Sequence, residues 1–148
     1  MISDICKKYG ISKYTINEDG SIDVDDNVDL YSMGLTELPL NFNKVNGYFN
    51  CSFNKLTTLK GCPKIITDDF NCNRNKINNL EYGPEIIGGD YYILKNNLYR
   101  IDHYPKYIGR LAYFDDYVAL PHELISSHRP VDEEYYLVIS YYNKWYSI

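Results

Sequence analysis

The chain has 148 residues, which suits one domain, and a hydrophobic fraction of 45%, which is enough to bury a core. The formal net charge of −5 disfavours a nucleic-acid-binding protein, because such proteins gain affinity by neutralising phosphates with a basic stripe. No apolar run approaches the ~20 residues of a membrane span, and residues 1–10 contain no secretory signal, so we expect a cytoplasmic domain without nucleic-acid or membrane partners.

The N-terminal segment, residues 1–26, is predicted to be a cap. A short helix is predicted over residues 1–12, with Ser3 as its N-cap. Apolar and polar residues alternate over residues 14–24 on both sides of an Asp-Gly dipeptide at 19–20, which is the strongest short-range signal for a β-hairpin. We expect this hairpin to cover the first turn of the following structure, since an open stack exposes its core and strand edges.

An acidic run follows the hairpin and comprises Asp23, Asp25, Asp26 and Asp29. Carboxylates are calcium ligands, but this run lacks the glycine and the distal glutamate of an EF-hand loop. We therefore interpret it as a solvated, acidic strand edge.

Residues 27–110 repeat one unit of 21 residues four times, without insertion or deletion. The same side-chain type returns at fixed places, in the columns Asn54, Asn75 and Asn96; Leu35, Leu56, Ile77 and Leu98; and Leu38, Leu59, Leu80 and Ile101. A period of about 20–29 residues predicts a solenoid, in which the stacked repeats bury an apolar face that no single repeat could bury alone.

A single repeat, YFNCSFNKLTTLKGCPKIITD, predicts a strand, a bend and a return to the core. Phe49 and Cys51 alternate with polar residues, and Asn54 follows at the bend, where its amide can bond to the backbone. Pro63 ends the regular run, and Ile66 returns the chain to the core. Stacking would place parallel strands about 4.8 Å apart and form two core columns, Val28, Phe49, Phe70 and Tyr91, and Leu30, Cys51, Cys72 and Ile93.

The pattern F-x-C-x-x-N-x-L-x-x-L-x-x-x-P-x-x-I resembles the leucine-rich repeat. The order INEDGSIDV, VDLYSMGLTELPLNF, FNCSFNKLTTLKGCPK resembles, more narrowly, short leucine-rich-repeat-like proteins of bacteriophages and large DNA viruses, over residues 14–110. The resemblance implies a right-handed β-solenoid with a concave strand face, but no defined activity, because that group is mostly uncharacterised. Two departures are Met33, which replaces the bend asparagine of the first repeat, and Pro39, which is shifted from the usual proline position.

Residues 111–148 are predicted to form a degenerate fifth turn and a C-terminal cap. Ala112 and Phe114 fit the core columns, whereas Tyr117 replaces the bend asparagine. The tail, residues 129–148, has Tyr135, Val138, Tyr142 and Trp145 at helical spacing, which favours a helical cap. Its β-branched and aromatic residues leave a strand as the alternative.

Catalytic and metal-binding motifs are absent from the sequence. Cys51 and Cys72 belong to a core column, and the four cysteines contain no CxxC pair, so neither a disulfide framework nor a zinc site is expected. His122 and His128 are too far apart for a zinc-protease motif, and nothing positions a third group to orient a Cys62–His103 pair. We expect no enzyme activity and no cofactor.

The strand residues that alternate with the core provide the candidate binding surface. The candidate partner-binding residues are Tyr31, Tyr48, Asn50, Phe53, Asn71, Arg74, Tyr92 and Lys95. Among them Tyr48, Phe53, Arg74 and Tyr92 are of the types enriched in interface hot spots. Phe53 stands out because Ser32, Arg74 and Lys95 occupy its place in other repeats, and the alternative is that Phe53 packs on the solenoid edge.

These residues lead to the hypothesis of a non-catalytic protein-binding module, present as a monomer or weak homodimer. The viral resemblance would place it in the host cytoplasm and make its partner a host protein, for example one used in defence. The alternative is a self-assembling or structural viral protein, in which the degenerate last turn and the aromatic tail pair two copies end to end.

Overall fold

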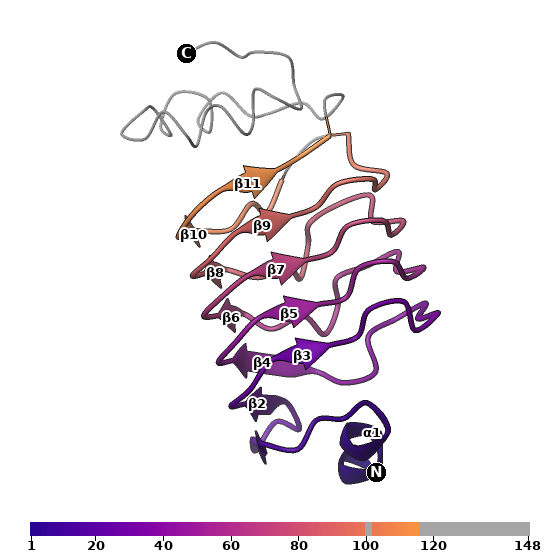
Figure 1. The fold of residues 1–148 in the computed structure, drawn as a ribbon, viewed down its shortest axis with the longest axis vertical. Coiled ribbons are helices and arrows are strands. Elements are labelled where there is room, and N and C mark those ends of the chain that lie inside the picture. The colour runs from indigo at the N-terminus through magenta and orange to yellow at the C-terminus, as the bar shows by residue number, and fades with distance from the viewer. Residues whose placement is uncertain (100–101, 116–148) are drawn as a thin grey trace.

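The computed structural model describes residues 1–99 and 102–115, which form a parallel β-solenoid with 21 residues in each coil (Figure 1). Sheet A contains β1 (Tyr14–Ile16), β2 (Ile22–Val24), β4 (Phe42–Val45), β6 (Ile65–Ile66), β8 (Ile86–Ile87) and β10 (Tyr107–Ile108), in that order. Sheet B contains β3 (Val28–Asp29), β5 (Phe49–Asn50), β7 (Phe70–Asn71), β9 (Tyr91–Tyr92) and β11 (Ala112–Tyr113), also in that order.

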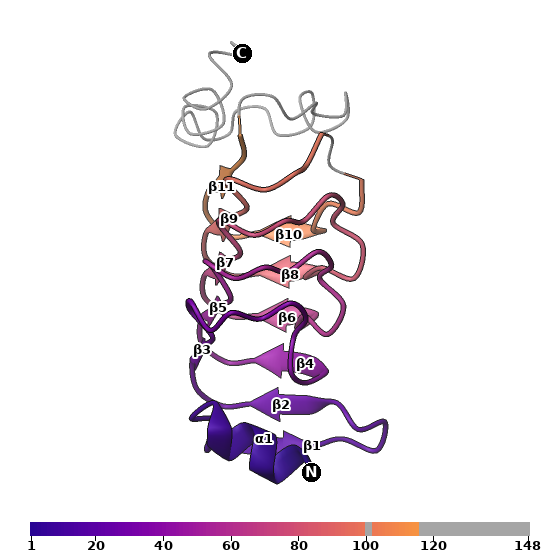
Figure 2. The same ribbon diagram turned by 90° about the vertical axis from the view of Figure 1, so that its right-hand side faces the viewer.

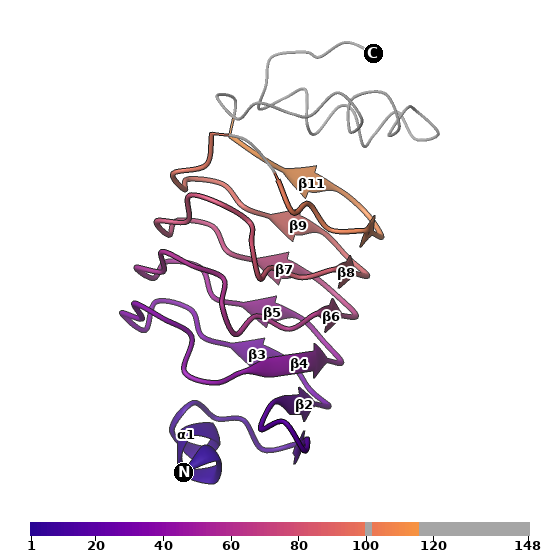
Figure 3. The same cartoon turned by 180° about the vertical axis from the view of Figure 1, so that it is seen from behind.

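The coils stack in a straight column, with the two sheets meeting along one corner (Figure 2). The third side of each coil is a loop that projects away from this corner (Figures 1 and 3). Neighbouring strands of sheet B are parallel and in register, so that Phe49 pairs with Phe70 and Phe70 pairs with Tyr91. The predicted parallel solenoid and its 21-residue step are therefore confirmed.

The N-terminal cap consists of a helix and the predicted hairpin. β1 and β2 pair antiparallel, with Tyr14 opposite Val24, and β2 then continues sheet A by pairing parallel to β4. Helix α1 (Ile2–Lys8) lies at the same end of the stack and buries Cys6 in the core. Its N-cap is Met1 rather than the predicted Ser3, because the helix begins at Ile2, with the terminal ammonium group bonded to the Asp4 carboxylate.

The core consists of the predicted columns, which run the length of the stack. Phe49, Phe70 and Tyr91 are 0% exposed, and their rings stack with centroid separations of 6.2 and 5.6 Å. Ala112 continues this column after Tyr91, and Phe114, from the neighbouring column, makes an edge contact with Tyr91 at a centroid separation of 5.8 Å. Aromatic pairs at these separations add to the stability gained from burial alone.

The Tyr91 hydroxyl is an unsatisfied polar group in this column. It is buried and has no hydrogen-bond partner among the described residues, although the equivalent Phe49 and Phe70 carry no polar atom. A buried polar group without a partner costs about 1–3 kcal/mol.

We expect Tyr91→Phe to raise the free energy of unfolding by about 1 kcal/mol, because it removes the unpaired hydroxyl and keeps the ring. Urea unfolding followed by circular dichroism measures this change. Tyr92→Phe is the matched control, since the Tyr92 hydroxyl is partly exposed and donates to Asp90 Oδ2 at 3.2 Å. A destabilised Tyr91→Phe protein would show that the hydroxyl contributes to the fold.

The bend asparagines form a buried ladder that joins each coil to the one before it. Asn54, Asn75 and Asn96 are 5–8% exposed. Asn75 Oδ1 accepts a hydrogen bond from Leu56 N at 3.0 Å, and its Nδ2 donates to the carbonyl oxygens of Cys51 and Cys72 at 3.0 and 3.3 Å. The predicted role of these amides in satisfying the bend is confirmed.

The first coil has Met33 at this place and is completed by the second coil. Asn54 Oδ1 accepts from Met33 N at 3.0 Å and from Leu35 N at 2.9 Å, while Asn54 Nδ2 donates to Leu30 O at 2.8 Å. The bend of the first coil is therefore satisfied by the asparagine of the second coil, although Met33 offers no amide of its own.

Two features differ from the expectations. The return of the chain to the core forms a second sheet, sheet A, where the sequence indicated only the inward Ile66. Ser52 alternates in the sequence with the core residue Cys51, which indicates the solvent side, yet it is 2% exposed and its hydroxyl donates to Asn50 Oδ1 at 2.6 Å. The predicted C-terminal helix and Tyr117 lie outside the described residues.

The acidic run after the hairpin is bonded to neighbouring amides. Asp23 Oδ1 accepts from Asn17 and Asn43 at 3.1 and 2.8 Å, and Asp25 Oδ1 accepts from Asn46 at 2.8 Å. Within residues 1–99 and 102–115, no group of three or more His, Cys, Asp or Glu residues could hold a metal ion. None of the helices in the same residues has the length and apolar character needed to cross a bilayer.

Candidate functional site

The structure brings the predicted partner-binding residues to the outer side of sheet B. We call this surface the sheet B face, and it comprises Tyr31, Tyr48, Asn50, Phe53, Asp69, Asn71, Arg74, Tyr92, Lys95 and Tyr113. Strand register places Asn50, Asn71, Tyr92 and Tyr113 in one column across four neighbouring strands. The face is therefore a rigid array whose rows repeat about every 4.8 Å.

An aromatic cluster lies near the N-terminal end of the face. The Phe53 ring is 5.2 Å from the Tyr31 ring, measured between centroids, and the Arg74 guanidinium carbon lies 5.2 Å from the centroid of Phe53. Phe53 nevertheless remains 46% exposed and Tyr31 49% exposed. Phe53 thus packs on its neighbours, as the alternative reading held, and still offers half of its surface to a partner.

The corner that presents this cluster has an uncommon backbone. Ser32, Phe53, Arg74 and Lys95 all have φ between 52° and 58°, a left-handed conformation that few residues other than glycine adopt. Hydrogen bonds to the next coil hold it, since Phe53 N donates to Asn73 O and Arg74 N donates to Leu94 O, at 2.9 and 2.8 Å. The sequence does not indicate this left-handed conformation, because none of the four positions is a glycine.

A second aromatic cluster lies at the C-terminal end of the face. The rings of Tyr92 and Tyr113 stack with centroids 4.5 Å apart and planes inclined by 15°. Burial and the nearby Asp90 carboxylate raise the pKa of Tyr92, so its hydroxyl stays protonated and donates to Asp90. Tyr113 was absent from the predicted set because it lies beyond the four repeats, although a further 21-residue step from Tyr92 points to it.

A shallow hollow of 230 Å³ lies between the two clusters. It is lined by Tyr48, Phe49, Asn50, Asp69, Asn71 and Tyr92. The side-chain oxygens of Asn50 and Asn71 accept hydrogen bonds from Ser52 N and Asn73 N, each at 3.0 Å. These bonds fix the two amide groups, whose Nδ2 atoms have no partner among the described residues and can donate to a ligand.

The two borders of the sheet B face differ in charge. On the side that joins sheet A, Arg110 lies 2.9 Å from Asp69 Oδ1 and 3.6 Å from Asp90 Oδ2, and the hydrogen bond that it donates to Asp69 raises the pKa of the guanidinium. On the loop side, the exposed Arg74 and Lys95 have no ion-pair partner among the described residues. Arg110 thus offsets part of the charge of the acidic border, which includes Asp68, Asp69 and Asp90, and the basic border is available to a partner's carboxylates.

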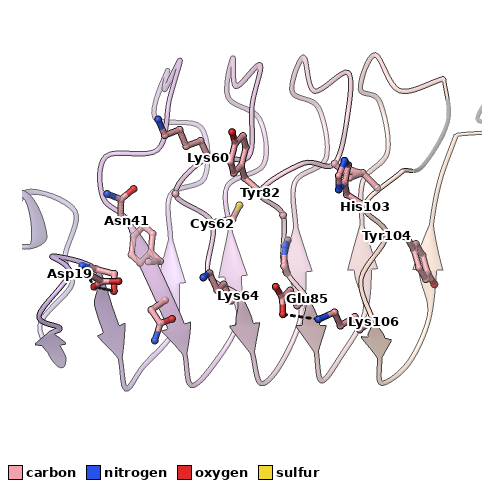
Figure 4. Close-up of a pocket in the computed structure, with 17 residues that line it drawn as sticks. Asp19, Asn41, Lys60, Cys62, Lys64, Tyr82, Glu85, His103, Tyr104 and Lys106 are labelled. Carbon is pink, nitrogen blue, oxygen red and sulfur yellow. Dashed lines mark hydrogen bonds and ion pairs between the residues drawn. The ribbon is translucent and has the colours of Figure 1, made fainter.

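Cys62 and His103 both line a separate groove of 560 Å³, on the side of the molecule that carries sheet A, but they come from the second and the fourth coil (Figure 4). Cys62 is only 5% exposed, and burial raises the pKa of its thiol well above the usual value. A thiol that stays protonated at neutral pH is a poor nucleophile. The geometry therefore gives this pair no catalytic arrangement.

The fold and the sheet B face together define a parallel β-solenoid with a polar and aromatic strand surface. No protein-family model matches the chain, and no curated protein or solved structure matches it either.

Proposed function

We propose that the protein is a non-catalytic binding module whose sheet B face engages a protein partner. The observation that carries this proposal is the presence of two aromatic clusters on one rigid sheet, the exposed pair Tyr31 and Phe53 and the half-buried pair Tyr92 and Tyr113, together with a hollow that holds two free amide donors. Tyrosine and arginine contribute most of the binding energy in many interfaces, and a hollow between them can receive a partner's side chain.

The rigidity of the face supports a binding role. Its side chains lie on strands in register, and the asparagine ladder ties each coil to the next, so little conformational freedom remains to be lost on binding. The unpaired Arg74 and Lys95 fit a partner that presents carboxylates beside an apolar anchor for Tyr31 and Phe53. With the viral resemblance of the repeats, that partner would be a host protein.

The test replaces each chosen residue with the residue that stands at the equivalent position of another coil. A triple variant, Tyr48→Asn, Phe53→Ser and Tyr92→Asn, places in each coil a residue that another coil carries at the same position, namely Asn27, Ser32 and Asn71. We expect this variant to keep its circular dichroism spectrum and to lose a cytosolic protein that the wild type captures from the natural host, as identified by mass spectrometry.

The matched control removes exposed apolar side chains away from the sheet B face. Ile16→Thr combined with Tyr99→Ser changes residues that are 50% and 74% exposed, and it should leave capture unchanged. Equal capture by the triple variant would place the binding site elsewhere. Capture of nothing but further copies of this chain, with association in sedimentation, would replace the proposal by self-assembly.

A further inference from the structure

The groove on the sheet A side has two walls and a floor that run along the axis of the stack (Figure 4). One wall is formed by Lys60, Tyr82 and His103, and the other by Lys64, Glu85 and Lys106, with Cys62 between them. Each wall collects its residues from successive coils, so the groove crosses the strands rather than following one of them.

Two glycines, Gly61 and Gly83, line the groove. At Gly83 an added Cβ would lie 2.9 Å from Leu80 O and 3.0 Å from Leu59 Cδ1, and at Gly61 it would lie 2.7 Å from Leu40 O. A side chain at Gly83 would therefore collide with Leu80 and Leu59, and one at Gly61 would collide with Leu40.

The first wall is raised by an unusual backbone. Tyr82 and His103 follow Gly61 at the 21-residue step and share its left-handed conformation, with φ of 67° and 60°. Such strain in residues other than glycine clusters at binding and active sites. Tyr82 is 58% exposed, so its ring remains available to a ligand.

The charge of the groove is the reverse of that of the protein. The chain carries a net charge of −5, yet three lysines and two carboxylates line the groove, namely Lys60, Lys64, Lys106, Asp19 and Glu85. Lys106 is 3.5 Å from Glu85. The pKa of Asp19 is lowered mainly by its hydrogen bond from Ser21 and to a smaller extent by Lys64, which forms no ion pair with it. Lys60 has no ion-pair partner among the described residues. Lys60 and Lys64 lie on opposite walls of the same coil, on either side of Cys62 (Figure 4). The Lys60 side chain points toward the loops, so both flexible stems would turn into the groove to bring the two ammonium groups to one anion.

We propose that this groove binds an extended peptide that places a carboxylate side chain between Lys60 and Lys64. From Asp19 to Lys106 the lining residues span four steps between coils, or about 19 Å, which an extended chain covers with about six residues. Asp19 and Glu85 flank the two lysines and would repel the regular phosphates of a nucleic acid. They tolerate a peptide, whose other side chains are neutral, and the amide of Asn41 can bond its backbone.

The test is a selection of random seven-residue peptides displayed on phage, with the immobilised full chain as the target. We expect aspartate and glutamate to be enriched several-fold among the retained peptides. The best peptide, labelled with a fluorophore, should bind Lys60→Gln/Lys64→Gln about tenfold more weakly than the wild type in an anisotropy titration, and its affinity should fall as salt is raised.

Two controls separate this site from the sheet B face. Lys55→Gln/Lys76→Gln removes the same charge from the loop side of the solenoid and should leave the affinity unchanged, as should the Tyr48, Phe53 and Tyr92 triple variant. Absence of acidic enrichment, equal affinity for the Lys60/Lys64 variant, or displacement of the peptide by an equimolar oligo(dT) or inorganic phosphate would overturn the proposal.

Discussion

Asn75→Leu is expected to lower the free energy of unfolding by about 3 kcal/mol. The substitution keeps the side-chain volume but orphans the buried Leu56 N–H, which bonds to Asn75 Oδ1 at 3.0 Å, at a cost of about 1–3 kcal/mol. It also removes the Nδ2 bonds to the carbonyls of Cys51 and Cys72, which keep one partner each in Asn54 and Asn96. Urea unfolding followed by circular dichroism measures the loss.

The control for this prediction is Asn97→Leu, an exposed asparagine in the neighbouring coil, for which we expect a change within about 0.5 kcal/mol. If Asn75→Leu were equally mild, the ladder would shape the bends without stabilising them, and sheet pairing alone would hold the coils together.

Phe70→Ala is expected to cost about 3–5 kcal/mol, the range for truncating a buried phenylalanine. The ring is 0% exposed and lies between Phe49 and Tyr91, so its removal leaves a void with an aromatic ring on either side. Neighbouring coils cannot close this void, because their separation is set by the strand hydrogen bonds.

Phe53→Ser serves as the comparison, since it removes a phenylalanine that is 46% exposed and introduces the residue that the first coil carries at that place. We expect a loss below about 1 kcal/mol in the same unfolding experiment. A similar loss for both variants would contradict the assignment of Phe70 to the core and Phe53 to the surface.

The sequence predicted the solenoid because three kinds of information agree in it. The step between Asn54, Asn75 and Asn96 sets the length of a coil, and the alternation around Phe49 and Cys51 identifies the strand of sheet B. The Asp-Gly dipeptide identifies the hairpin at the N-terminal end. Each of these signals depends on a local pattern, which a single sequence contains in full.

Sheet A was not predicted, because its repeated strands are too short to show an alternation of apolar and polar residues. The pair Ile65–Ile66 has one exposed and one buried residue, and two residues cannot display a period of two. The groove was not predicted for another reason. Tyr82 and His103 adopt a backbone that only Gly61 makes evident in the sequence, and Lys60 and Lys64 come to lie on opposite walls of the groove only in the folded coil.

The sheet B face was predicted in outline, since alternation alone decides which strand residues point outward. The sequence did not indicate that Arg74 would lie over the Phe53 ring, or that Tyr113 would extend the column of Tyr92. Both depend on contacts between coils. The role of the face in binding stays a prediction.

Each coil is completed by hydrogen bonds from the coil that follows it in the sequence, and this order has a consequence for synthesis on the ribosome. Asn54 completes the bend that contains Met33, 21 residues earlier in the chain, and Phe49 N donates to Asp69 O in the coil that follows. A newly made coil therefore has unsatisfied bend and strand groups until its successor has left the exit tunnel. Folding must trail translation by about one coil, and a prematurely terminated chain always ends in a coil that cannot close.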